Sequence, residues 1–76
     1  MMTRYRNLDG NSGVSYYESG PDFIRLKFLG GSTYVYDYAK PGLIHVERMK
    51  ALASVGRGLS AYISRYVQDG YARREK

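Results

Sequence analysis

The hydrophobic pattern of this chain changes its period near the midpoint, and that change constrains the fold more than any other feature. In residues 23–29, apolar and polar side chains alternate, so that Ile24, Leu26 and Phe28 share one face. Residues 33–38 alternate in the same way. A period of two is typical of β-strands, whereas the spacing of three and four that follows is typical of amphipathic helices. The chain is therefore predicted to place its strands before its helices.

A third strand is predicted over residues 13–18, which are rich in β-branched and aromatic side chains. Short turn-forming segments connect it to residues 23–29, and connect those in turn to residues 33–38. Because short turns join antiparallel neighbours, the simplest arrangement is a three-stranded antiparallel meander.

Two helices are predicted in the second half of the chain. The first has an apolar face made of Val46, Met49, Leu52 and Ala53. After a break at residues 54–58, the second has an apolar face made of Leu59, Tyr62, Ile63 and Tyr66. Since the apolar face of a small sheet needs cover, we expect an α+β domain in the order β-β-β-α-α, with both helices packed on one face of the meander.

The length of 76 residues allows one domain at most. We assign this domain to residues 13–70. Residues 1–12 contain few apolar side chains and a turn-prone cluster, so they are predicted to form a flexible N-terminal tail. Residues 71–76 are predicted to form a basic C-terminal tail.

The register of the hairpin between the second and third predicted strands decides where three tyrosines point: Tyr34, Tyr36 and Tyr38. A two-residue loop at Gly30–Gly31 would place them on an exposed face beside the cations of the preceding strand, a layout that suits stacking of unpaired bases. A three-residue loop, with Gly31 in the left-handed conformation, would place them beneath the helices. We favour the second register, because it buries the large rings on the face that needs cover.

The charge distribution indicates an anionic partner. The formal net charge is +5; residues 1–39 carry four basic and four acidic side chains, whereas residues 40–76 carry eight and three. Such a surplus attracts phosphates and acidic surfaces. Six cations of the second half are candidate phosphate contacts: Arg48, Lys50, Arg57, Arg65, Arg73 and Arg74. The predicted partner is thus RNA or another nucleic acid, or else an acidic protein.

Residues 56–61 match the letters of a dinucleotide-binding motif, G-x-G-x-x-A, but not its context. The motif would follow a helix rather than a strand, in a chain too short for the fold that gives those glycines their role. A weaker hypothesis is a phosphate nest, in which amides near Ser54 and Gly56, together with Arg57, hold one phosphate before the last helix. The alternative, which we favour, is a helix–helix turn whose glycines permit close packing.

Catalytic chemistry has little support in the sequence. The chain has no Cys and a single His, His45, and its carboxylates show no metal-ligand or paired spacing. We therefore expect no catalytic residue, no metal and no cofactor, and a half-buried structural position for His45.

No apolar run approaches the ~18 residues of a membrane span and no secretory signal is recognisable, so we expect a cytoplasmic protein that does not enter a membrane.

Several of these segments together resemble the KTSC domain, a family named after the C-terminal extension of some lysyl-tRNA synthetases. The similarity extends over about residues 13–67 and rests on Leu26–Phe28, Gly31, Tyr34–Tyr36, Pro41, Ala53–Gly56, Ile63 and Tyr66. The family also includes small stand-alone bacterial and phage proteins, and it has a characteristic Y-x-Y in the middle. It has no established function, but its attachment to a synthetase suggests RNA binding. The resemblance implies no catalytic residue.

Two functional hypotheses follow. The first is a small non-catalytic module that binds RNA, or another nucleic acid, through the basic C-terminal half. The second is a protein-interaction module that uses an exposed strand edge or the basic surface.

Overall fold

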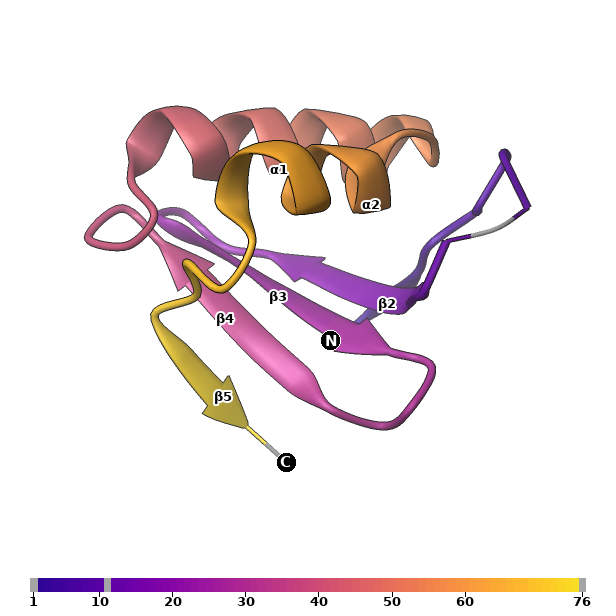
Figure 1. Cartoon of the computed structure of the whole chain (residues 1–76), viewed down its shortest axis with the longest axis horizontal. Helices are drawn as coiled ribbons and strands as arrows, with labels where there is room; N and C mark the ends of the chain where they lie inside the picture. The colour runs from indigo at the N-terminus through magenta and orange to yellow at the C-terminus, as the bar shows by residue number, and fades with distance from the viewer. Residues whose placement is uncertain (1, 11, 76) are drawn as a thin grey trace.

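A computed structural model describes residues 2–10 and 12–75 of the chain (Figure 1). One antiparallel sheet contains five strands in sequence order: β1 (Thr3–Arg4), β2 (Val14–Ser19), β3 (Phe23–Phe28), β4 (Thr33–Asp37) and β5 (Arg73–Glu75). Between β4 and β5 come α1 (Leu43–Val55), α2 (Leu59–Tyr62) and η1 (Ile63–Val67), the last being a π-helical turn that continues α2. These helical segments lie over one face of the sheet (Figure 1).

The predicted α+β class and the central meander β2-β3-β4, followed by helical segments, are confirmed, but the described sheet has five strands where three were predicted, and the last of them, β5, follows the helices. The two additional strands lie at its edges. Strand β1 has two residues, and β5 has three charged ones, so neither carries an alternating apolar pattern. Such short strands are stabilised by backbone hydrogen bonds to a neighbouring strand, which the local sequence does not reveal.

The N-terminal segment therefore differs from the predicted flexible tail. Strand β1 pairs with Tyr16 and Tyr17 of β2, and the residue that follows it, Tyr5, is only 3% exposed. The Tyr5 hydroxyl accepts a hydrogen bond of 3.3 Å from the backbone N–H of Leu59, which joins this segment to the start of α2. The predicted C-terminal tail likewise contains β5, which pairs with β4. Positions 1, 11 and 76 of the two predicted tails lie outside the described residues.

The β3–β4 hairpin adopts the second of the two registers, which confirms that prediction. Leu26 lies opposite Tyr34. Gly31 has a φ of 92°, the N–H of Phe28 donates to the carbonyl of Ser32, and the N–H of Gly31 donates to the carbonyl of Phe28, both over 2.9 Å. A positive φ is accessible to glycine but costs other residues ~1–2 kcal/mol, so Gly31 favours the three-residue loop.

As a consequence, aromatic rings of β4 belong to the core. Tyr36 is 1% exposed, and burial raises its pKa above the usual value for tyrosine. Tyr34 is half-buried and stacks on Tyr71, with ring centroids 4.6 Å apart. The same prediction is wrong for Tyr38, which lies one residue beyond the end of the strand and is partly exposed; its hydroxyl donates to Glu47 over 2.6 Å.

Helix α1 presents the predicted apolar face to the sheet. Val46, Met49 and Ala53 are at most 1% exposed, and Leu52 lies half-buried at the edge of this face. The helix ends at Gly56, which has a φ of 87° and whose N–H donates to the carbonyl of Leu52 over 2.8 Å. A left-handed glycine ends a helix without steric cost, so the chain can reverse here.

The second helical segment buries Leu59 and Ile63 as predicted, but the prediction for Tyr66 is wrong. Tyr66 is 57% exposed, and Val67 is buried in its place. The cause is the π-helical turn, in which the N–H of Gln68 donates to the carbonyl of Ile63, five residues earlier. A π-helix has more residues per turn than an α-helix. Leu59, Ile63 and Val67, which are four residues apart, therefore point toward the sheet, and the ring of Tyr66 points away from it.

This burial pattern predicts that Ile63→Ala lowers the free energy of unfolding by ~2–5 kcal/mol, as large-to-small core substitutions do. Tyr66→Ala is expected to cost about 1 kcal/mol or less, because the ring is already largely in water and loses only its contact with a neighbouring ring. Denaturant unfolding of both variants beside the unmodified protein measures the difference. Equal losses of stability would contradict the π-helical register.

The buried hydrogen bond of Tyr5 gives a second prediction. Tyr5→Phe keeps the ring but removes the acceptor for the N–H of Leu59, and a buried donor left unpaired costs ~1–3 kcal/mol. Tyr16→Phe, at a partly exposed ring of β2, is the matched control and is expected to change stability by no more than ~0.5 kcal/mol. Thermal unfolding measures both. A neutral Tyr5→Phe would show that the N-terminal segment does not stabilise the fold through this bond.

Candidate functional site

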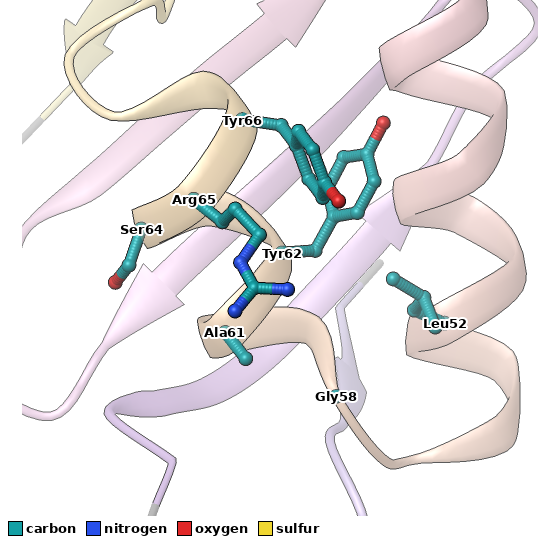
Figure 2. A pocket seen from close by; sticks show the side chains of 7 residues that line it. All are labelled: Leu52, Gly58, Ala61, Tyr62, Ser64, Arg65 and Tyr66. Atoms are coloured by element: carbon teal, nitrogen blue, oxygen red, sulfur yellow. The ribbon is translucent and has the colours of Figure 1, made fainter.

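A shallow groove runs between α1 and the continuous segment of α2 and η1, on the outer surface of the helical layer (Figure 2). One part has a volume of ≈ 600 Å³ and is lined by Leu52, Gly58, Ala61, Tyr62, Ser64, Arg65 and Tyr66. An adjoining part of ≈ 410 Å³ is lined by Ile44, His45, Arg48, Tyr62 and Tyr66. The two parts share the rings of Tyr62 and Tyr66, and together we call them the helical groove.

Two tyrosines form the centre of the helical groove. The rings of Tyr62 and Tyr66 lie beside each other, with centroids 4.9 Å apart and planes tilted by 46° (Figure 2). A hydrogen bond of 2.7 Å joins the Tyr62 hydroxyl to Nδ1 of His45 on α1. The imidazole ring of His45 and the ring of Tyr62 meet edge to face. His45 is half-buried, as predicted, and it holds Tyr62 in place. Tyr66 packs on this fixed ring and is otherwise exposed to solvent.

Two arginines line the groove beside these rings. Arg48 comes from α1 and Arg65 from η1, and both side chains are exposed. Among the described residues that line the helical groove, none is acidic. The groove therefore combines aromatic surface with positive charge, a combination that suits a ligand with flat rings and anionic groups.

Lys50, a third predicted contact, lies on α1 but is engaged by local partners. Its ammonium group pairs with Glu47 at 3.0 Å, donates to the carbonyl of Pro21 and lies 5.8 Å from the centre of the Tyr38 ring. Hydrogen bonds from Tyr38 and from Lys50 hold the pKa of Glu47 below its usual value. The charge of Lys50 is thus largely compensated by a neighbouring carboxylate.

The other predicted cations lie elsewhere. Arg57 pairs with Asp9 at 3.4 Å in the turn between the helices. Arg73 projects from the face of the sheet opposite the helices and pairs with Glu75 at 3.3 Å. Arg74, on β5, donates to the Ser32 hydroxyl at 3.2 Å and lies 5.9 Å from the ring centre of Tyr34. The structure thus brings Arg48 and Arg65 to one groove and distributes the remaining four over other surfaces.

The residues of the predicted phosphate nest form a self-contained turn. The amides of Gly56 and Arg57 donate to the carbonyl of Leu52, and the amide of Leu59 donates to the Tyr5 hydroxyl. A Cβ atom at Gly56 would lie 2.7 Å from Cβ of Arg6, so the glycine permits the N-terminal segment to pack closely here. The carbonyl of Ser54 accepts a hydrogen bond from that arginine. This geometry fits the helix–helix turn better than a nest, since these amides donate within the protein.

Sequence reasoning missed two features of this surface. It placed Tyr66 in the core, and the α-helical spacing of its neighbours contains no signal for the π-helical turn that exposes it. It also gave no role to Arg4 and Arg6, which line a cavity of ≈ 340 Å³ at the β1 edge of the sheet. Residues 4–6 alternate cation, aromatic and cation, but three residues are too few to indicate a strand, so the local sequence contains no signal for this segment.

Within residues 2–10 and 12–75, no group of three or more His, Cys, Asp or Glu side chains could hold a metal ion. In the same residues, no helix combines the length and the apolar character that crossing a bilayer requires.

The chain matches no protein-family model, no curated protein and no solved structure. The resemblance to the KTSC domain therefore stays a prediction.

Proposed function

We propose that the protein is a small non-catalytic module that binds RNA, or another nucleic acid, in the helical groove. The observation that carries this proposal is the exposed ring of Tyr66, packed on Tyr62 in a groove that Arg48 and Arg65 also line. The resemblance to the KTSC domain adds RNA as the first ligand to test.

The tyrosine pair suits unpaired bases. Base–aromatic stacking contributes ~1–3 kcal/mol per base in proteins that bind single strands, and it tolerates any sequence because every base has a π-face. Bases inside a duplex are stacked on one another and cannot reach such a ring. Tyr66 offers its exposed ring, while the bond from Tyr62 to His45 fixes the ring beneath it.

The two arginines suit the phosphates on either side of a stacked base. A guanidinium group forms paired hydrogen bonds to phosphate oxygens and keeps its charge at every physiological pH. Since Arg48 and Arg65 come from different helical segments, a strand lying along the groove can meet both of them.

The alternative, a protein-interaction module that uses a strand edge, has less support. The described edge strands have only two and three residues, and both carry arginine. Short, charged edge strands are poor templates for pairing with another chain. An acidic protein segment in the helical groove is the remaining competitor, and a competition experiment separates it from nucleic acid.

Titration of a fluorescent single-stranded RNA at several salt concentrations tests the arginines. With ~0.7 counterions released per phosphate of a single strand, two contacts predict a slope of log affinity against log salt of ~−1.4. Arg48→Gln combined with Arg65→Gln is expected to remove most of that slope. The absence of binding by the unmodified protein at low salt would refute the proposed function.

Arg73→Gln is the matched control for charge, because this residue projects from the opposite face of the sheet. It is expected to leave the slope unchanged. A polyglutamate peptide represents the alternative ligand, an acidic protein segment. We expect it to displace the RNA only weakly, since it has no rings to stack. Displacement by polyglutamate at the same concentration as unlabelled RNA would favour the acidic-protein alternative.

The stacking contact gives a separate prediction. Tyr66→Ala is expected to weaken RNA binding ~5- to 150-fold, which corresponds to the loss of one stacked base, and to leave the salt slope unchanged. Tyr66→Phe retains the ring and is expected to bind within about twofold of the unmodified protein. Equal binding by the alanine and phenylalanine variants would show that Tyr66 does not stack on the ligand.

A further inference from the structure

Neighbouring hollows with shared lining residues extend from the helical groove to the cavity at the β1 edge of the sheet. A small depression of ≈ 50 Å³ shares Gly58 and Ala61 with the groove, and shares Asn7 and Ser12 with the edge cavity. The three hollows thus follow one another from η1, past the start of α2, to β1, and we call this series the path.

Cations occur at both ends of this path. Arg48 and Arg65 line the groove, and Arg4 and Arg6 line the edge cavity. The guanidinium group of Arg6 donates to the carbonyl of Ser54 over 3.4 Å, which holds this arginine near the end of α1. The positive charge therefore continues beyond the groove that carries the proposed function.

The middle of the path is not strongly repulsive to an anion. Asp9 is the only acidic side chain among the described residues that line the three hollows, and Arg57 pairs with it at 3.4 Å. At the far end, the ring of Tyr16 lines the edge cavity and is 40% exposed. The edge cavity thus repeats the combination of aromatic ring and arginine that the groove displays.

We propose that a single strand of nucleic acid follows this path, with Arg4 and Arg6 holding phosphates beyond the nucleotide that stacks on Tyr66. Tyr16 offers its ring to a second base. This inference rests on the proposed function and adds to it a longer footprint and a second set of contacts.

The shape of the path selects a single strand. It turns from the helical layer around the β1 edge to Arg4 and Tyr16, which lie on the opposite face of the sheet, within a molecule whose described extents are 30 × 24 × 21 Å. Duplex DNA has a persistence length of ~50 nm, so it does not bend over such a distance without a large cost. A flexible single strand follows the turn without that cost.

Length dependence of RNA binding tests the path. Oligouridylates of about four and about twelve nucleotides, both within the range of single-strand site sizes, are titrated at several salt concentrations. Two further phosphate contacts predict a slope of log affinity against log salt that is more negative by ~1.4 for the longer strand. The slope is the informative quantity, because extra binding positions on a longer strand raise its affinity without changing the slope.

Arg4→Gln combined with Arg6→Gln is expected to abolish the difference between the two lengths and to leave the short strand unaffected. Since Arg6 packs against Gly56, Arg4→Gln alone is the second variant; it affects only an exposed residue and is expected to reduce the slope difference by about half. Lys40→Gln, in the turn before α1, is the matched control and is expected to change neither slope.

Equal slopes for the two lengths, or a slope difference that persists in the variant without Arg4 and Arg6, would refute the proposed path. Neither result would contradict binding of RNA in the helical groove. A duplex that binds as tightly as the longer single strand would also overturn the path. If neither oligonucleotide binds at any salt concentration, the proposed function itself fails, which is a distinct result.

Discussion

The pairing register of β3 with β4 is the constraint on which the rest of this structure depends. Side chains alternate along a strand, so a shift of one residue would exchange the two faces of β4. The loop at Gly31, with its positive φ, places Leu26 opposite Tyr34 and thereby directs Tyr34 and Tyr36 toward the helices. Those rings then form part of the core on which α1 and α2 pack.

The same register decides what the opposite face of the sheet can do. Val35 points to that face and is 1% exposed, although the helices lie on the other side. Arg25, directly opposite Val35 on β3, pairs with Glu18 on one side and with Glu75 at 3.0 Å on the other. Arg25 and Arg73 on this face are thus partly neutralised by neighbouring carboxylates, whereas Arg4 and Tyr16, which lie opposite each other on β1 and β2, add an arginine and an aromatic ring to this face at the β1 edge.

The candidate site could be predicted only in part. The exposed positions of Arg48 and Arg65 follow from helical periodicity, because each lies on the side of its helix that faces away from the apolar residues. Tyr66 could not be placed correctly, since an α-helix and a π-helical turn predict opposite positions for its ring. The edge strands were missed because their stability comes from backbone pairing with β2 and β4 rather than from a pattern of their own.

For the β3–β4 hairpin the sequence left two registers open, and burial of the tyrosine rings favoured the observed one. Periodicity by itself determined the α+β class, the central meander and the buried face of α1. These features depend on residues close together in the chain, whose alternation or backbone freedom selects one local geometry. The tertiary structure alone decided which cations share a surface, that Tyr66 faces solvent and that residues 3–5 belong to the fold. The physical reason is that each of these outcomes depends on contacts between distant segments, such as the bond between Tyr5 and Leu59, that no local pattern encodes.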